Sequence, residues 1–498
     1  MSTGRSGAAG ESLTHALARW ASRLSLDDVP ARVVDLATSQ VLSQLAAIRA
    51  GSAHPLGRKL IQAYGQPLQP DTAKAACVLA SLGSWLNLDD TAYAGHLGPS
   101  TVSVPVAYAH ALELDGKALL SAIIVANECA ARITAAATLG PFRGQSALHT
   151  HLAGAVAGRL HCEQAPAQRW VDAFGLSFST PSWPSMHGFL GSDAKALHAF
   201  VPVRTAMDAC DAAAAGLTGV PDILEHPDGF LAGFASVPLP AAVTDGLGVR
   251  WHTDTLSYKI RPGGPGIDAA VDCAVQLHRE LIEGGDCPER DVVSVDVDAS
   301  LYTQFAGRRA EQYLAGRDTP ISALLLTAPY AVATALLTGD LTVADFAPPA
   351  LNSGRRWELA GRVRLVHDEK MTAALFDSVA PFGEAVRQAG PRAARWLESF
   401  GAAALAAERP VASSNFEHAT KRTPARVTVH LYDGRTLTRE RDIPVGAAGP
   451  HTRSAHAQLT RAKFLTHGGS VAVADDLGRL VDCTAQDLAR LLPLALAS

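Results

Sequence analysis

The sequence has few of the features that mark metal centres or nucleic-acid binding. Its seven cysteines form no C-x-x-C pair, so a structural zinc or an iron–sulfur cluster has no visible ligand set. Scattered cysteines in odd number are typical of free thiols in a reducing cytoplasm. Lys and Arg total 43 against 48 Asp and Glu, a net charge of −5, which argues against a nucleic-acid or anionic membrane partner. We therefore expect a cytoplasmic protein that binds neither nucleic acid nor membrane and holds no metal.

Long apolar runs and aromatic residues are also scarce. The first twelve residues, MSTGRSGAAGES, lack the apolar core of a secretion signal. The uncharged run 321–339 is long enough to span a membrane, but it contains Pro329 and several hydroxyl side chains and lacks a flanking basic cluster, so we expect a buried helix. Aromatics make up 6% of the 498 residues and hydrophobic residues 48%, which favours a mainly helical globular protein of two or three domains.

The periodicity of the sequence divides the chain into two kinds of region. Apolar residues recur at helical spacing up to about residue 235, and helices are predicted over 71–86, 115–139, 152–162, 203–217 and 221–232. Later segments alternate like strands, and the predicted strands are 292–297, 362–366 and 426–432, the last followed by an Asp433-Gly434 hairpin turn. Further helices are predicted over 267–282, 321–338, 390–406, 455–465 and 486–496. The fold class is therefore mainly α, with an all-helical domain (1–265 and 448–498) and an inserted α+β lid domain (266–447).

Polar residues are concentrated in the segment 87–100, NLDDTAYAGHLGPS, which follows a nearly apolar helix. A carboxylate such as Asp90 beside His96 can orient the imidazole for proton transfer near neutral pH. Asp and Thr are also good helix caps, and Gly-Pro-Ser forms turns. Both an active site and a capping cluster remain open at this point.

Two further groups of residues could bind an anion or move a proton. His149 and His151 begin an alanine-rich helix, where a histidine can face a ligand in its neutral form or simply face water. A zinc site is not expected from this pair because a third ligand is missing. Lys259 and Arg261 precede the glycines of 263–266 and a helix, an arrangement that suits a carboxylate or phosphate, or else a solvated linker.

Lysine is rare in this chain, so each lysine is a candidate for a specific role. The eight lysines are Lys59, Lys74, Lys117, Lys195, Lys259, Lys370, Lys421 and Lys463. Lys195 lies in a glycine-punctuated loop and forms an S-x-x-K pattern with Ser192, which some serine acyl-transferring enzymes use. The partner motifs S-D-N and K-T-G are missing. A serine hydrolase and a non-catalytic helical binding protein therefore stay as remote alternatives.

The order of several motifs resembles the MmgE/PrpD family, which includes 2-methylcitrate dehydratase, cis-aconitate decarboxylase and iminodisuccinate epimerase. The similarity rests on LNLDDTAYAGHLGPSTVSVPVAYA, RGQSALHTHLAGAVAGRL and PSWPSMHGFLGSDAKALHAFVP. It continues through GLTGVPDILEHPDGFLAGF, TDTLSYKIRPGGPGIDAAVD and APYAVATALLTGDL. The resemblance implies a helical domain with an α+β lid, a cleft for a di- or tricarboxylate, no metal or other cofactor, and a homodimer.

The resemblance also assigns roles to individual residues. Asp90 and Thr91 match the family's first loop, and His149 or His151 its second histidine, with the H-L-A-G context favouring His151. Lys195 and Lys259 match its two lysines, and Tyr313 matches a tyrosine beside the cleft. The residues implied in the site are thus His96, His151, Asp90, Lys195 and Lys259 as catalytic groups, and Thr91, Asn87, His149, Arg261 and Tyr313 as substrate-binding groups.

This chain departs from the family at three places. Asn87 stands where members commonly have Asp, and an amide cannot act as a base. His96 is offset from the usual histidine, which falls near Gly98 or Pro99, and Gly263 and Gly264 replace a His or Cys. The departures predict a different carboxylic acid substrate, or an inactive homologue. The working hypothesis is a hydro-lyase in which His96, supported by Asp90, moves a proton and His151 assists the leaving hydroxyl, with an epimerase or a decarboxylase as the alternatives.

Overall fold

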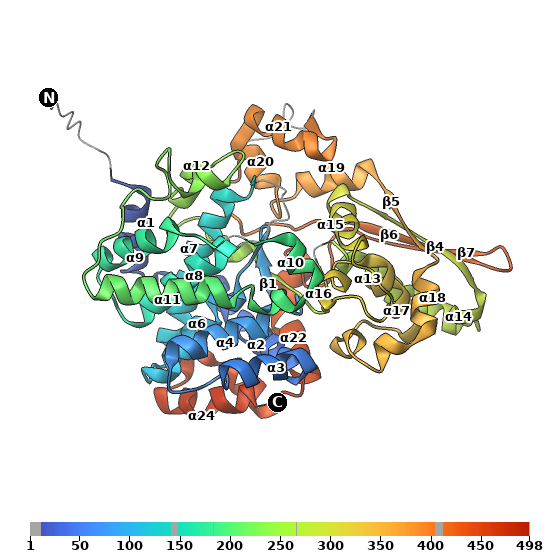
Figure 1. Ribbon diagram of the computed structural model, residues 1–498, viewed down its shortest axis with the longest axis horizontal. Helices are drawn as coiled ribbons and strands as arrows, with labels where there is room; N and C mark the ends of the chain where they lie inside the picture. The colour runs from blue at the N-terminus through green and yellow to red at the C-terminus, as the bar shows by residue number, and fades with distance from the viewer. Residues whose placement is uncertain (1–10, 141–147, 183, 265, 404–411, 498) are drawn as a thin grey trace.

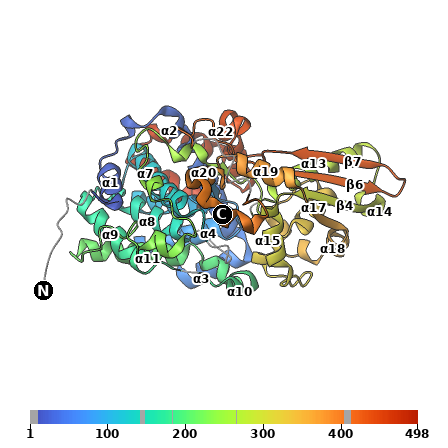
Figure 2. The same cartoon turned by 90° about the horizontal axis from the view of Figure 1, so that it is seen from above.

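The computed structural model describes residues 11–140, 148–182, 184–264, 266–403 and 412–497. Most of these residues are helical, and the strands form two small sheets. Figures 1 and 2 show two parts side by side: a helical part, which the chain enters first and returns to at its C-terminal end, and a smaller part that contains the longer strands.

The helical part comprises two stretches of chain. Its helices are α1 (Leu13–Ala21), α2 (Ala31–Ala53), α3 (Pro55–Tyr64), α4 (Thr72–Ser84), α5 (Gly98–Thr101), α6 (Ser103–Ala111), α7 (Gly116–Ala137), α8 (Leu148–Cys162), α9 (Ala167–Ser179), α10 (Met186–Gly191), α11 (Phe200–Ala214), α12 (Phe230–Phe234), α22 (Pro450–Thr466), α23 (Val471–Leu477) and α24 (Ala485–Leu496). The tail helix α22 packs along α2, so the two ends of the chain share this part.

Helix α7 forms the centre of the helical part. The side chain of Asp115 caps its first turn by accepting from the Ala118 N–H, as expected for an N-cap residue. Among the described residues, α7 is the one helix that is long and apolar enough to cross a membrane, and nearly all of it is buried inside the protein. Its apolar side chains pack against α8 and the neighbouring helices, as the prediction of a helix over 115–139 required.

The smaller part, here called the α+β part, contains β4–β7 and α13–α18. Its elements are α13 (Asp268–Glu283), α14 (Pro288–Asp291), β4 (Val292–Ala299), α15 (Leu301–Glu311), α16 (Ile321–Leu324), α17 (Ala328–Thr338), α18 (Gly354–Ala360), β5 (Val363–His367), β6 (Ala425–Leu431) and β7 (Thr436–Arg441). The strand order is β5-β4-β6-β7, with β4 and β5 parallel and the other pairs antiparallel. The predicted hairpin between β6 and β7 is confirmed, and Gly434 has a φ of 86°.

Three shorter helices link the two parts: α19 (Glu369–Asp377), α20 (Gly383–Ala389) and α21 (Ala394–Leu397). Their buried side chains join the hydrophobic core of the helical part, whereas α13, α17 and the sheet form a second core. Trp396 shows this attachment, because its indole N–H donates to the carbonyl of Gly140 at 3.1 Å. The described residues of 375–402 and 416–419, which lie inside the predicted lid, thus pack with the helices.

Several predicted helices differ from the observed elements. Residues 221–229 form turns, and only α12 is helical there, because Pro221 and Pro227 interrupt the segment. The predicted helix over 321–338 is divided into α16 and α17, with Pro329 in the first turn of α17. Within 390–406, short turns and α21 replace one continuous helix, and residues 404–406 lie outside the described residues.

The helical part also contains a three-stranded sheet, so the prediction of an all-helical domain was wrong. Its strands are β1 (Asp90–Ala92), β2 (Gly95–His96) and β3 (Ser257–Tyr258), in the order β2-β1-β3. Strands of two or three residues are too short to produce a recognisable alternation of polar and apolar side chains. This small sheet positions the candidate site.

Candidate active site

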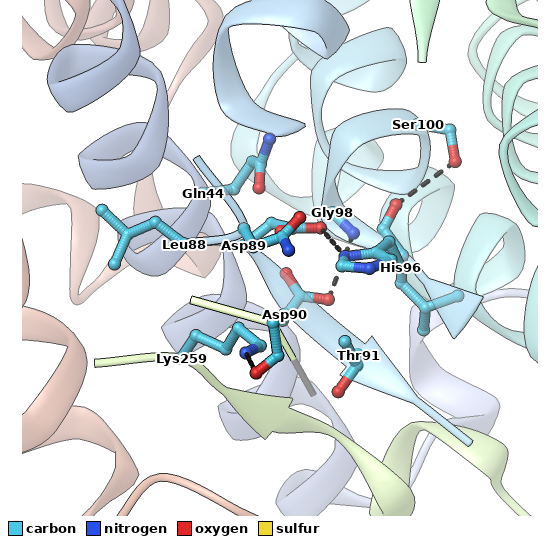
Figure 3. A network of polar contacts seen from close by, with 12 residues as sticks. Gln44, Leu88, Asp89, Asp90, Thr91, His96, Gly98, Ser100 and Lys259 are labelled. Atoms are coloured by element: carbon cyan, nitrogen blue, oxygen red, sulfur yellow. Dashed lines mark hydrogen bonds and ion pairs between the residues drawn. The ribbon is translucent and has the colours of Figure 1, made fainter. Parts of the chain in front are cut away.

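The sheet brings together residues that are far apart in the sequence. Thr91 pairs with His96 across β1 and β2, and Asp90 pairs with Tyr258 across β1 and β3. Lys259 follows β3 directly, and its backbone N–H donates to the carbonyl of Asp89 at 3.3 Å. Figure 3 shows Asp90, Thr91, His96 and Lys259 around the short strands.

The central pair of the site is Asp89 and His96. The Nδ1 atom of His96 lies 2.7 Å from Oδ2 of Asp89, which is fully buried, while 21% of the His96 side chain is exposed. Burial by itself would raise the pKa of Asp89, but the charge of His96 and its hydrogen bond outweigh burial and hold that pKa below its usual value. The carboxylate therefore accepts the Nδ1 proton, which leaves Nε2 as the basic nitrogen. No described residue forms a hydrogen bond with Nε2.

Asp90 does not support His96, contrary to the sequence-based expectation. Asp89 directly precedes β1 and Asp90 is its first residue, and Asp90 forms no hydrogen bond or ion pair with His96. Its Oδ1 accepts from Nε2 of Gln40 at 2.8 Å and from the Gly98 N–H at 3.1 Å. Burial, together with the negative charge of Asp89, raises the pKa of Asp90 to about 7. Asp90 thus holds the segment around Gly98 to α2 through Gln40. Asp89 is the carboxylate partner of His96.

Lys195 reaches the site from the 3-10 helix η2 (Asp193–Leu197). Its Nζ donates to Oδ1 of Asn87 at 2.7 Å, and the side chain is buried. Burial lowers the pKa of Lys195 to about 8, with the opposing effect of Asp89 the next in size. Asn87 itself has a φ of 49°, a conformation that Asn and Asp tolerate better than most residues. The amide that cannot act as a base therefore acts as a hydrogen-bond acceptor for the ammonium group.

The Ser192 hydroxyl does not contact Lys195 in a way that the S-x-x-K hypothesis needs. It donates to the Gly188 carbonyl at 2.6 Å and accepts from the Ala194 N–H at 3.2 Å, so it caps η2. Ser192 is exposed while Lys195 is buried against Asn87. The arrangement gives no support to a serine nucleophile activated by this lysine.

Lys259 and Arg261 are held by carboxylates of the α+β part. Nζ of Lys259 donates to the Gly263 carbonyl at 2.6 Å and lies 3.3 Å from Oδ2 of Asp268. Arg261 forms a 2.7 Å ion pair with Asp272 and a second one with Asp340. The guanidinium group of Arg261 is thus paired with Asp272 and Asp340, and not with Asp89.

The two histidines of α8 have different surroundings. His149 packs against Phe230 and Phe234, with a ring distance of 4.7 Å to Phe234. His151 lies 5.9 Å from the ring of His198, and His96, Asp89 and Lys195 act electrostatically on it. His151 is therefore the histidine of α8 that lies with the candidate site.

Tyr313, two residues after the end of α15, connects the two parts of the protein. Its hydroxyl lies 2.9 Å from Nδ1 of His187 in α10. A Cβ on Gly191 would lie 3.0 Å from its ring, so the glycine permits this close approach. Helix α16 also contacts α10 where the two parts meet (Figure 1).

Sequence reasoning missed Asp89, His198 and Lys421 as members of the cluster. Lys421 is buried, and its Nζ donates to Oγ1 of Thr91 at 2.7 Å. The signal that could have found it was the rarity of lysine, but the segment around it carries no motif. The signal for Asp89 was its place directly before Asp90 in the same acidic pair. In the part of the chain that the structure describes, no three His, Cys, Asp or Glu residues are placed to hold a metal ion.

The fold and the site define a mainly helical protein with a histidine–carboxylate pair beside several buried ammonium groups. Residues 15–240 match the MmgE/PrpD N-terminal domain, and residues 264–389 match the MmgE/PrpD C-terminal domain. The chain therefore belongs to the MmgE/PrpD family, as its motifs indicated. This family includes dehydratases and related enzymes. No curated protein matches the chain.

The environment of His149 and His151 predicts a loss of stability in acid. Burial lowers the pKa of each to about 3, against about 6.5 in an unfolded chain. The unfolded state therefore binds more protons between pH 6.5 and 3, and the free energy of unfolding falls as the pH falls through this range, by up to about 1.4 kcal/mol per pH unit for each histidine. Urea unfolding followed by circular dichroism at pH 7.5, 6 and 5 measures the slope. His149→Leu is expected to reduce it, and an unchanged slope in this variant would contradict the assignment.

The contact between Asn87 and Lys195 makes a second prediction. Asn87→Asp places a carboxylate 2.7 Å from the ammonium nitrogen, so the pKa of Lys195 rises above its value of about 8 and its charge is neutralised locally. We expect the affinity for an added carboxylate probe such as glutarate to fall by about tenfold, because a buried ion pair attracts an anion less strongly than an ammonium group without an ion-pair partner. Isothermal titration calorimetry with the wild type and Asn87→Asp tests this, and equal affinities would refute it.

Proposed function

We propose that this protein is a cofactor-independent lyase that removes water from a di- or tricarboxylate, as 2-methylcitrate dehydratase does. The observation that carries the proposal is the free Nε2 of His96, oriented by Asp89, in the same cluster as the buried ammonium group of Lys195. Removal of a proton next to a carboxylate needs a base and a cation that stabilises the enolate-like charge. Both groups are available here.

The charge of Lys195 supports an anionic substrate. Its hydrogen-bond partner among the described residues is the neutral amide of Asn87, and it forms no ion pair with any of them. A buried cation without a direct ion-pair partner is unfavourable, and a substrate carboxylate would supply one. Lys259, in contrast, already lies beside Asp268.

The proposed reaction uses one histidine for both proton transfers. Nε2 of His96 takes the α-proton, and the electron pair of the C–H bond becomes the new C=C bond as the adjacent C–O bond breaks. The departing hydroxide receives a proton from the imidazolium of His96 and leaves as water. His151, neutral because its pKa is about 3, can donate a hydrogen bond to that hydroxyl but cannot serve as an imidazolium acid.

Proton exchange in D₂O tests this proposal directly. The protein is incubated with citrate, 2-methylcitrate, cis-aconitate, malate and iminodisuccinate, and deuterium at the α-carbon and new olefinic signals are followed by NMR. Exchange or turnover of one compound, lost in Lys195→Met, supports carboxylate C–H chemistry. If the folded protein shows neither exchange nor turnover with any of these compounds, the proposed function is contradicted.

The same experiment separates the alternative reactions of the family. Deuterium incorporation with inversion and no loss of water would identify an epimerase, and release of CO₂ would identify a decarboxylase. Both need the histidine base and the carboxylate-binding lysine, whereas only dehydration needs a leaving hydroxyl. We also propose a homodimer, as the family resemblance implies, which light scattering after size-exclusion chromatography tests.

A further inference from the structure

Lys421 is a buried cation that contacts the site through Thr91, although no sequence motif marks it. Its backbone is fixed by the N–H bond to the Ala448 carbonyl at 2.9 Å and by a β-bridge to Ala380. Lys421 is 330 residues from Thr91 in the sequence, and its Nζ donates to Oγ1 of Thr91 in the small sheet at 2.7 Å. Thr91 lies directly across the β1–β2 register from His96.

The electrostatic neighbours of Lys421 are those of the site. Burial is the main cause that lowers its pKa to about 8, and the charge of Lys259 lowers it further, while Asp268 and Asp89 oppose this. Asp89 and Lys259 also act on Lys195. The two ammonium groups therefore share one neighbourhood around Asp89.

The ammonium group of Lys421 makes few direct contacts with the described residues. Thr91 is its hydrogen-bond acceptor among the residues described, and none of these forms an ion pair with it. Lys463 is also buried, but it donates to two acceptors, the hydroxyl of Ser43 and the Leu88 carbonyl. An ammonium group with three donors and a single neutral acceptor is left ready to bind an anion.

We propose that Lys421 and Thr91 form a second carboxylate-binding point, so that the site selects substrates with two carboxylates. This inference rests on the proposed function. Because Oγ1 of Thr91 accepts from Lys421, the hydroxyl proton of Thr91 is directed elsewhere and can be donated to the same carboxylate. Lys195 binds the carboxylate next to the reacting carbon, and Lys421 binds the other one.

A pair of ligands that differ in one charge tests this assignment. Glutarate and its monoamide glutaramate have similar shapes, but the amide replaces one carboxylate. Isothermal titration calorimetry at pH 7 gives the ratio of their affinities, which we expect to be about tenfold or more in the wild type. Lys421→Met and Lys421→Gln should reduce the ratio towards one, because both remove the charge that distinguishes the ligands. Lys370→Met, at an exposed lysine, is the matched control and should leave it unchanged.

Thermal unfolding without ligand distinguishes binding from a structural role. Removal of an unpaired buried charge should keep or raise the Tm in Lys421→Met, whereas a structural lysine would lower it. An unchanged affinity ratio in both Lys421 variants overturns the inference. If Lys195→Met still loses glutarate binding in that case, the proposed function stands without the role given to Lys421. If the wild type binds neither glutarate nor glutaramate, the proposed function and the role of Lys421 are both overturned.

Discussion

Replacement of His96 by Gln is expected to reduce α-proton exchange by about 10²- to 10⁴-fold, the usual contribution of a positioned general base. Glutamine is similar in size and can still form a hydrogen bond with Asp89, but it has no basic nitrogen. Substrate affinity should change little, because the proposed carboxylate contacts come from the lysines. Deuterium exchange by NMR gives the rate, and calorimetry gives the affinity.

Two further variants make the result specific to His96. Asp89→Asn replaces the carboxylate that lies 2.7 Å from Nδ1 of His96 with a neutral amide, whose N–H can favour the wrong imidazole tautomer, so exchange should also fall. His451→Gln, at an exposed position of α22, should behave as the wild type. Full exchange activity in His96→Gln would show that another group is the base.

Replacement of Lys195 by Met should lower kcat/KM by about 10²- to 10³-fold, comparable to the loss of one group that stabilises a developing oxyanion. The same variant should keep or raise the Tm of the ligand-free protein, because an ammonium group whose pKa is lowered to about 8 by burial destabilises the folded state. Steady-state kinetics and thermal unfolding measure the two effects, and Lys370→Met serves as the control.

The pH dependence of the wild type follows from the same lysines. Lys195 and Lys421 both have their pKa lowered to about 8, so they are cationic below that pH and lose their charge as the pH rises through it. The kcat/KM for an anionic substrate should therefore decrease above about pH 8. A profile that stays flat to pH 10, or full activity of Lys195→Met, would contradict the role given to Lys195.

The sequence by itself determined the class of the fold, because long apolar periodicities need no distant contacts to be recognised. It predicted α7, the strands β4–β6 and the hairpin at Gly434, and its motif order indicated the MmgE/PrpD family, which the matches over residues 15–240 and 264–389 show. It also directed attention to His96 and Lys195. Its helical spacing wrongly predicted a helix over 221–232, where Pro221 and Pro227 lie in turns that precede α12.

Only the tertiary structure decided which neighbours these residues have. Asp89, the residue before β1, contacts His96, whereas Asp90, the first residue of β1, accepts from Gln40 and the Gly98 N–H. The strands are two or three residues long, too short for a periodic signal, and their pairing joins segments near residues 90 and 258. Lys421 lies 330 residues from Thr91 in the chain. Such contacts depend on how distant segments pack, and a local pattern of residues does not contain that information.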